Sequence, residues 1–118
     1  MNEDNLQSQI VRWFNNTHCL KTNPNRCCIF SVPNGGFRNA LEAMKLKATG
    51  LLAGVSDLIV LLPNQCLFIE LKQEKGMQSP EQKDFENRVK NLGFDYYLIR
   101  SLEDFQKLIE FKINNLHK

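Results

Sequence analysis

Residues 54–72 read GVSDLIVLLPNQCLFIELK, two apolar segments separated by a short polar connection. The apolar segments extend from Asp57 to Leu62 and from Leu67 to Lys72, and Pro63-Asn64-Gln65 lies between them. Short, continuous apolar runs bounded by turn residues are typical of strands that are covered on both faces. We therefore predict that these segments are neighbouring strands at the centre of a sheet.

The second predicted strand carries two charged side chains. Because side chains alternate along a strand, Glu70 and Lys72 project from the same face. The length of the turn decides whether Asp57 joins them. A two-residue turn at Pro63-Asn64 places Asp57 opposite Glu70, and a four-residue turn places it opposite Lys72. Both registers gather the three charged groups on one face, whereas a three-residue turn directs Asp57 away unless a bulge intervenes.

These residue types suit the hydrolysis of a phosphodiester bond. Two neighbouring carboxylates, Asp57 and Glu70, repel each other unless a cation lies between them, and Mg²⁺ or Mn²⁺ prefers such oxygen ligands. The backbone carbonyl of Leu71 is a further candidate metal ligand. Lys72 is placed to stabilise an attacking hydroxide or the charge that develops on phosphorus. An E-x-K triplet alone is often a solvated strand edge, but here the strand is apolar and an aspartate begins its neighbour.

Helical and strand patterns alternate along the rest of the chain. Apolar spacing and capping residues predict helices over about residues 4–15, 39–48, 79–92 and 101–116, and apolar runs predict strands over 27–32 and 94–100. The resulting order is α-β-α-β-β-α-β-α. It predicts a single α/β domain over residues 1–118, a sandwich around a mixed sheet.

The start of the helix over 79–92 has a complete capping signature. Ser79 is the expected N-cap, and Gln82 closes a capping box three residues later. We expect Phe85, Val89 and Leu92 to point inward. The capping box alone explains Gln82, so its spacing leaves open whether it also serves a site.

The composition excludes several classes of protein. The 118 residues carry 15 Lys and Arg against 13 Asp and Glu, a net charge of +2 that is too small for a uniformly basic nucleic-acid binder. The longest wholly apolar run, Leu58 to Leu62, is much shorter than a membrane span, and the acidic N-terminus does not resemble a secretory signal. The 4 cysteines show no C-x-x-C spacing. We therefore expect an intracellular, cytoplasmic protein with reduced cysteines, no organic cofactor and no membrane partner.

Three motifs resemble those of a known nuclease superfamily. Gly54-Val55-Ser56-Asp57, Glu70-Leu71-Lys72 and Ser79-x-x-Gln82 resemble the PD-(D/E)xK nucleases, and more narrowly their virus-type replication-repair nuclease (VRR-NUC) branch. Glu3-x-x-Leu6-Gln7 is similar to the first-helix motif of that branch, and Pro33-Asn34-Gly35-Gly36-x-Arg38 is similar to the loop before its second helix. Ser56 stands where the superfamily name has proline, at a position that shapes the backbone. The resemblance extends over nearly the whole chain.

The resemblance implies a restriction-endonuclease-like three-layer α/β/α sandwich and a role for each site residue. Asp57 and Glu70 would hold Mg²⁺ or Mn²⁺, and Glu3 could complete the metal site. Lys72 would serve the nucleophile, and Gln82 would support the active site from the start of its helix. The implied activity is that of a metal-dependent endodeoxyribonuclease. Stand-alone members of this branch resemble Holliday-junction resolvases that act as homodimers, so branched DNA and a second copy of the chain are the expected partners.

Positive charge around the site is the expected means of binding DNA. The candidate contacts are Gly35, Gly36, Arg38, Lys45, Lys47, Lys75 and Lys83. A turn also explains the glycines, and a solvated surface also explains the basic residues. Two alternatives stay open: a non-catalytic DNA-binding or assembly module with this fold, and a nuclease that acts more broadly on DNA or RNA. A domain this small has little room to recognise a sequence as well as cut, which favours selection by DNA structure.

Overall fold

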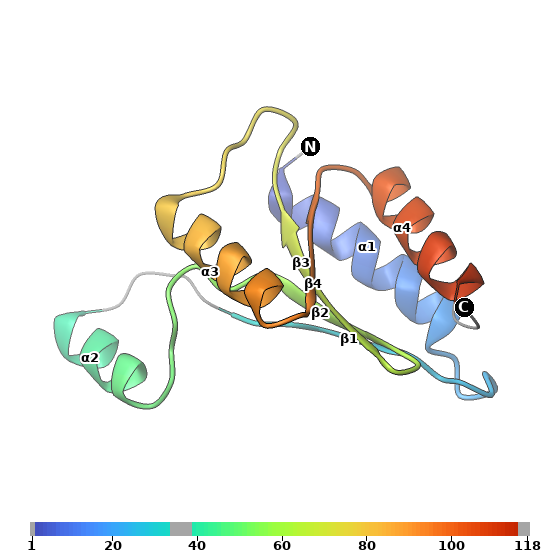
Figure 1. Cartoon of the computed structure of the whole chain (residues 1–118), viewed down its shortest axis with the longest axis horizontal. Helices are drawn as coiled ribbons and strands as arrows, with labels where there is room; N and C mark the ends of the chain where they lie inside the picture. The colour runs from blue at the N-terminus through green and yellow to red at the C-terminus, as the bar shows by residue number, and fades with distance from the viewer. Residues whose placement is uncertain (1, 34–38, 116–118) are drawn as a thin grey trace.

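A central sheet with helices on both faces forms the body of the molecule (Figure 1). The computed structural model describes residues 2–33 and 39–115. In these residues the elements are α1 (Glu3–His18), β1 (Cys28–Ser31), α2 (Ala40–Ala48), β2 (Leu58–Leu62), β3 (Gln65–Leu71), α3 (Pro80–Asn91), β4 (Asp95–Ile99) and α4 (Leu102–Asn114). Their order is the predicted α-β-α-β-β-α-β-α, with small differences at the ends of elements.

The sheet has the strand order β1-β2-β3-β4. β2 is antiparallel to both of its neighbours, whereas β4 runs parallel to β3, so the sheet is mixed as predicted. Leu62 pairs with Gln65, which leaves a two-residue turn at Pro63-Asn64. Asn64 has a φ of 58°, and a positive φ after a proline is the pattern of a type II turn. Of the registers compatible with the sequence, the structure therefore has the one that places Asp57 opposite Glu70.

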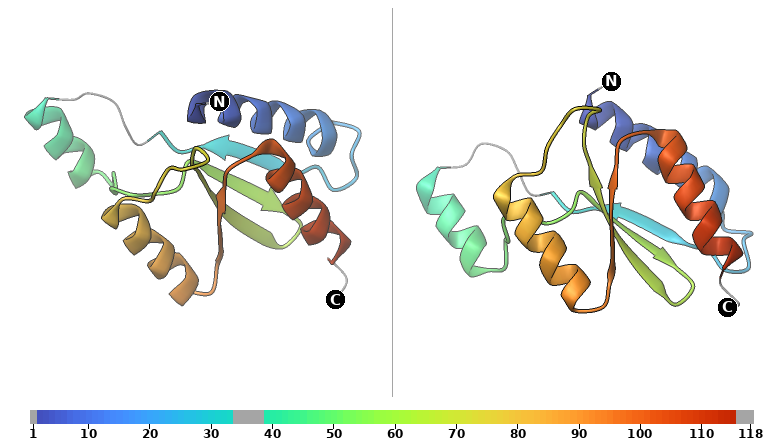
Figure 2. Two further views of the ribbon diagram at one scale, coloured as in Figure 1. Left: turned by 90° about the horizontal axis from the view of Figure 1, so that it is seen from above. Right: turned by 45° about the horizontal axis from the view of Figure 1, so that its top comes forward.

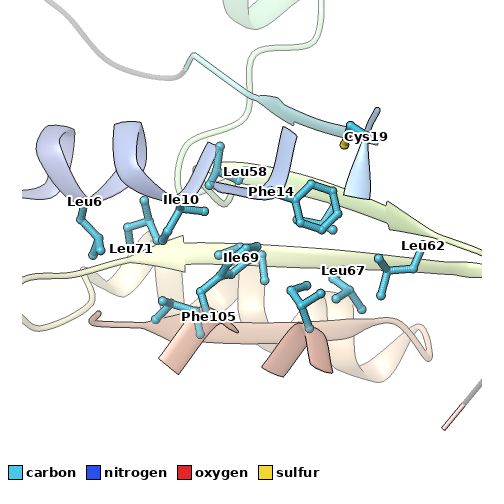
Figure 3. Packing of buried hydrophobic residues seen from close by; sticks show 13 residues of the cluster. Leu6, Ile10, Phe14, Cys19, Leu58, Leu62, Leu67, Ile69, Leu71 and Phe105 are labelled. Atoms are coloured by element: carbon cyan, nitrogen blue, oxygen red, sulfur yellow. The ribbon is translucent and has the colours of Figure 1, made fainter. Parts of the chain in front are cut away.

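Helices α1 and α4 cover one face of the sheet, and α3 covers the other (Figure 2). The face beneath α1 and α4 holds the main core, in which Ile10, Phe14 and Phe105 pack against the sheet (Figure 3). Leu67 and Ile69 of β3 point into the same core, and all five side chains are fully buried. Because side chains alternate along a strand, Phe68 and Glu70 of β3 are directed toward α3.

An aromatic cluster lies between α3 and the sheet. Phe85 of α3 contacts Phe68 of β3 and Tyr96 of β4, with ring centroids 5.8 and 6.2 Å apart. Val89 is buried as predicted, but Leu92 is 74% exposed, so the prediction that it points inward is wrong. Leu92 is the C-cap of α3, where the chain leaves the helix and its side chain no longer lies on the packed stripe.

Helix α2 lies apart from the sandwich (Figure 1). The sequence predicts an apolar face of Leu41, Met44 and Ala48, but no residue of α2 is buried, and Leu41 and Met44 are 62% and 68% exposed. On the sheet, α3 packs mainly against β4, and Leu61 of β2 is 39% exposed. The prediction that both central strands are covered on both faces is therefore wrong for part of β2.

Two further observations concern individual side chains. Trp13 of α1 is half-buried and packs against the core. The cysteines Cys19, Cys27, Cys28 and Cys66 are free thiols.

In the described part of the chain, no helix has the length and apolar character needed to cross a membrane.

Candidate active site

Asp57 and Glu70 lie side by side where β2 begins and β3 approaches its end. The pairing of Leu58 with Ile69 continues by one residue to Asp57 and Glu70, on the face that α3 covers. The Oδ2 atom of Asp57 accepts a hydrogen bond of 2.7 Å from the backbone N–H of Leu71. This bond holds the aspartate across the end of β3, next to the glutamate.

Glu70 is the buried acidic group of the site. The residue is 1% exposed, and its Oε1 atom has no hydrogen-bond partner among the described residues. The other oxygen, Oε2, accepts a hydrogen bond of 3.5 Å from Nε2 of Gln82. Burial away from water, and then the adjacent carboxyl group of Asp57, raise the pKa of Glu70 to about 9, while Lys72 opposes the rise. In the absence of a cation, Glu70 therefore holds a proton at neutral pH.

A divalent cation fits this pair of carboxylates. A buried oxygen without a partner costs about 1–3 kcal/mol, and a metal ion bound to Glu70 would supply the missing partner. The backbone carbonyl of Leu71 follows directly on the strand and is the candidate third ligand. Within residues 2–33 and 39–115, no group of three or more His, Cys, Asp or Glu side chains is arranged to hold a metal. Water would therefore complete the coordination of such an ion, as Mg²⁺ commonly requires.

Glu3 contributes to the electrostatics of the site from the start of α1. Its negative charge helps to raise the pKa of Glu70, after the larger effects of burial and of Asp57. Glu3 also lies in the first turn of α1, where an acidic side chain stabilises the helix dipole. Its role as a metal ligand stays a prediction.

Lys72 follows β3 directly and is half-buried. Its backbone N–H donates a hydrogen bond of 3.1 Å to the carbonyl of Ile99, which extends the parallel pairing of β3 with β4 by one residue. Burial dominates the raised pKa of Glu70, and the charge of Lys72 acts against it, so the ammonium group lies within electrostatic reach of the carboxylates. A cation in this place stabilises developing negative charge on an attacking or phosphate oxygen.

The first turn of α3 orients Gln82 toward Glu70. The N-cap Ser79 accepts a hydrogen bond of 3.2 Å at Oγ from the backbone N–H of Gln82. In return, Oε1 of Gln82 accepts a hydrogen bond of 2.9 Å from the backbone N–H of Ser79. With its oxygen engaged by the cap, the same amide presents its nitrogen to Glu70. One side chain therefore closes the capping box and contacts the acidic pair.

A cavity of about 530 Å³ opens beside Asp57. Its walls come from Gln7 of α1, the end of β1, residues 53–55, Asp57 and the first turn of α3. Gly54 lies in this wall with a φ of 87°, and a Cβ atom there would overlap the carbonyl group of Glu81. Glycine tolerates both the positive φ and the close approach. The contact brings the segment that carries Asp57 against the start of α3.

The predicted DNA contacts lie in separate parts of the chain. Gly35, Gly36 and Arg38 are outside the described residues. The four lysines are all exposed: Lys45 and Lys47 on α2, Lys75 in the loop after β3 and Lys83 on α3. Their contact with DNA stays a prediction, since a solvated surface also accounts for exposed lysines.

Two residues near the site received no role from the sequence. Gln7 belongs to the first-helix motif, but the motif does not indicate that its side chain lines the cavity beside Asp57. Arg100 follows β4, and its guanidinium reaches the loop after Lys72. The sequence signal that could have drawn attention to Arg100 is its place directly after a buried strand. Its contact with the loop could not be predicted, because that contact depends on the pairing of β3 with β4.

The sandwich and its site define the class of protein. Helices cover both faces of a mixed sheet, and two acidic side chains and a glutamine lie together at one end of its central strands with a lysine within electrostatic reach, as expected for the PD-(D/E)xK nuclease class. The chain belongs to the VRR-NUC domain family, because the family model described as "VRR-NUC domain" matches residues 1–103. Membership of this nuclease-domain family supports a nuclease-like function.

Two solved structures share the fold. One, described as "VRR_NUC domain protein", has a TM-score of 0.76 and 23% sequence identity, over 97% of this chain and 89% of the other. A second, described as "VRR_NUC domain", has a TM-score of 0.61 and 21% identity, over 92% of this chain and 94% of the other. A search of curated proteins finds no match to the chain. The structural neighbours confirm the predicted α/β fold class.

Proposed function

We propose that this protein is a metal-dependent endonuclease that hydrolyses phosphodiester bonds in branched DNA, such as Holliday junctions, as a homodimer. The observation that carries the proposal is the unpartnered, fully buried Oε1 of Glu70 beside the carboxyl group of Asp57. Two adjacent acidic side chains, one of them buried with an oxygen that lacks a partner, form a donor set that suits a divalent cation. The family of the chain favours a nuclease as the reason for that cation.

In the proposed reaction, different residues of the chain bind the metal ion, contact the reacting oxygen atoms and orient the metal ligands. Asp57, Glu70 and the carbonyl of Leu71 would hold Mg²⁺ or Mn²⁺. A bound ion of this kind lowers the pKa of water and offsets the charge of a phosphate group. Lys72 would donate a hydrogen bond to the attacking oxygen or to a phosphate oxygen. Gln82 would keep the carboxylate of Glu70 in a fixed orientation, since its own amide is held by the helix cap.

Branched DNA is the proposed substrate class for reasons of size and symmetry. A four-way junction needs two strands cut, which two copies of this chain would supply. Phe111 of α4 is 62% exposed and offers apolar surface for such a contact. The exposed lysines Lys75 and Lys83, after β3 and on α3, would contact the phosphate backbone near the site. We also propose a cytoplasmic location for the protein, together with its DNA substrate.

A cleavage assay tests this function directly. Wild type should cut a synthetic four-way junction in Mg²⁺ or Mn²⁺, and Glu70→Ala and Lys72→Ala should fold but not cut. Glu103→Gln is the matched control, because Glu103 is an exposed acid on α4 whose ion pair with Lys107 is also exposed. Cutting by either site variant would contradict the assignment of the site.

Comparison of substrates tests the finer parts of the proposal. Junctions, flaps, linear duplex and RNA should be cut at different rates, with junctions fastest. Equal cutting of linear duplex would contradict the junction preference, and preferred cutting of RNA would favour the broader nuclease. Absence of both cutting and Mn²⁺ binding would favour a non-catalytic DNA-binding module. Light scattering should give the mass of a dimer, and a monomer that resolves junctions would contradict the homodimer.

A further inference from the structure

The loop that follows Lys72 is tied to the end of the neighbouring strand by one arginine. Nη1 of Arg100 contacts the backbone carbonyls of Gln73 at 2.6 Å, Glu74 at 3.1 Å and Gly76 at 2.8 Å. These contacts cross more than 20 residues of sequence and join the segment after β3 to the segment after β4. Arg100 is exposed, yet its guanidinium is directed at the main chain of the same molecule.

The anchored loop also passes close to the side chain of Lys72. The loop closes on itself through a hydrogen bond of 2.9 Å from the N–H of Gly76 to the carbonyl of Gln73. Gly76 has no Cβ atom, but one placed on its backbone would lie 3.5 Å from Cδ of Lys72, so the loop backbone passes close to the lysine stem. The aliphatic stem of Lys72 therefore runs beside the part of the loop that Arg100 holds.

Lys72 has little other restraint from the sheet. β3 ends at Leu71, and the backbone N–H of Lys72 makes one further bond, to Ile99. Arg100 follows Ile99 directly, so both ties to the Lys72 region come from the same end of β4. A guanidinium is suited to this task because its donors are rigidly oriented and permanently charged, and here the two N–H groups of Nη1 are shared among three carbonyls.

We propose that Arg100 is a positioning residue for Lys72: it pins residues 73–76 so that the loop holds the lysine side chain beside the acidic pair. The catalytic part of this inference rests on the proposed nuclease function. In this proposal Arg100 acts through the loop rather than on the substrate, because its Nη1 is engaged with main-chain carbonyls. Loss of Arg100 should therefore disturb the catalytic step and leave DNA binding intact.

The physical part of the proposal is tested without any activity measurement. Hydrogen exchange of the Gly76 amide should accelerate by at least about tenfold in Arg100→Ala, because the loop opens more often. Relaxation of ¹³C-labelled lysine should show a less ordered Lys72 side chain in the same variant. Arg88→Ala is the matched control, because Arg88 is also exposed and makes one long, exposed ion pair on α3. Unchanged exchange and an unchanged Lys72 side chain would overturn the proposal.

The kinetic part separates positioning from direct contact with DNA. In Arg100→Ala, kcat should fall about 10- to 100-fold, since small displacements of a reacting group are costly, while KM and the affinity for DNA stay unchanged. Arg100→Lys should recover part of kcat, because an ammonium group still reaches a carbonyl. A weaker affinity for DNA with a shallower salt dependence would instead identify Arg100 as a phosphate contact and overturn the proposal.

The two proposals fail in different ways. If wild type does not cut DNA, the proposed function is contradicted, and the exchange and relaxation data still decide whether Arg100 orders Lys72. If wild type cuts and Arg100→Ala cuts at the same rate, the nuclease function stands and the positioning role is overturned.

Discussion

Oδ2 of Asp57 accepts a 2.7 Å hydrogen bond from the backbone N–H of Leu71, the residue that follows Glu70 on the neighbouring strand. Asp57 lies directly before the first residue of β2. The hydrogen bond fixes its side chain beside the buried glutamate of β3. This main-chain donor keeps the carboxyl group of Asp57 next to that of Glu70. The same bond offers a way to separate the structural role of Asp57 from its proposed role as a metal ligand.

Replacement of Asp57 by Asn and by Ala should have different effects on folding but the same effect on metal binding. Both variants should lose Mn²⁺ binding in calorimetry, because the charged oxygen is gone. Asp57→Asn retains an oxygen for the Leu71 N–H and should unfold at about the wild-type denaturant concentration. Asp57→Ala leaves that donor unpaired and should lose about 1–3 kcal/mol. Mn²⁺ binding by Asp57→Asn at wild-type affinity would show that Asp57 is not a ligand.

The raised pKa of Glu70 predicts a pH dependence of stability in the metal-free protein. The pKa is about 9 in the folded chain, chiefly because of burial, against 4.5 for a free glutamate. Between these values the folded state holds a proton that the unfolded state has lost. The free energy of unfolding should therefore be greatest near and below the unfolded pKa and fall as pH rises toward 9, by up to ~1.4 kcal/mol per pH unit.

Urea unfolding in a chelator, from about pH 5 to about pH 8, measures this dependence. Glu70→Gln carries no titrating group and should have a flatter profile, so that it becomes more stable than wild type at the alkaline end. Glu103→Gln on the surface of α4 should follow the wild-type profile. Parallel profiles for wild type and Glu70→Gln would contradict the raised pKa. Added Mn²⁺ should stabilise wild type more strongly at higher pH, since the ion competes with the proton on Glu70.

Gly54→Ala should disturb the contact between the segment before β2 and the start of α3. The new Cβ would overlap the carbonyl group of Glu81, and the positive φ would add strain. Gly50→Ala is the matched control, because Gly50 has a φ of 114° but no neighbouring atom within 4 Å of its Cβ position. In both variants, backbone strain should lower the free energy of unfolding by about 1–2 kcal/mol, and in Gly54→Ala the overlap should lower it by about 1–3 kcal/mol more. Equal losses in chemical denaturation would contradict the contact.

Two substitutions of Gln82 should separate its capping role from its contact with Glu70. Glu is also a good capping-box residue at this position, so Gln82→Glu should keep α3 intact while it replaces a donor by a carboxylate beside Glu70. Its nuclease activity should fall about 10- to 100-fold, the usual effect of removing a group that orients a metal ligand. Gln82→Ala should lose activity and also roughly 0.5–1 kcal/mol of stability. Full activity in Gln82→Glu would show that the 3.5 Å contact has no catalytic role.

Much of the site could be predicted because it depends on local pattern. The apolar runs before and after Pro63-Asn64 predict paired strands, and alternation places Glu70 and Lys72 on one face whatever surrounds them. The capping box at Ser79 and Gln82 is a property of four consecutive residues and appears in the structure as predicted. Burial of Leu92 was predicted from helical spacing and is wrong, because spacing does not tell where a helix stops packing.

The length of the turn between β2 and β3, by contrast, could not be predicted from the sequence alone. The sequence permits three registers for β2 and β3, and the structure has the two-residue turn that faces Asp57 toward Glu70. The sequence also does not predict the position of α2 relative to the sheet. Its Leu41 and Met44 repeat like a core stripe, but a helix buries such a stripe only where another element lies within reach.

The sequence by itself determined the order of the elements, the central strands and the identity of the acidic pair, because these follow from short-range periodicity and side-chain chemistry. Tertiary structure alone decided that Glu70 is buried with an unpartnered oxygen, that a helix cap turns Gln82 toward it, and that Arg100 reaches the loop after Lys72. Each of these depends on segments that are distant in sequence and become neighbours only when β3, β4 and α3 pack together. The pKa of Glu70, and with it the proposed chemistry, arises from that packing.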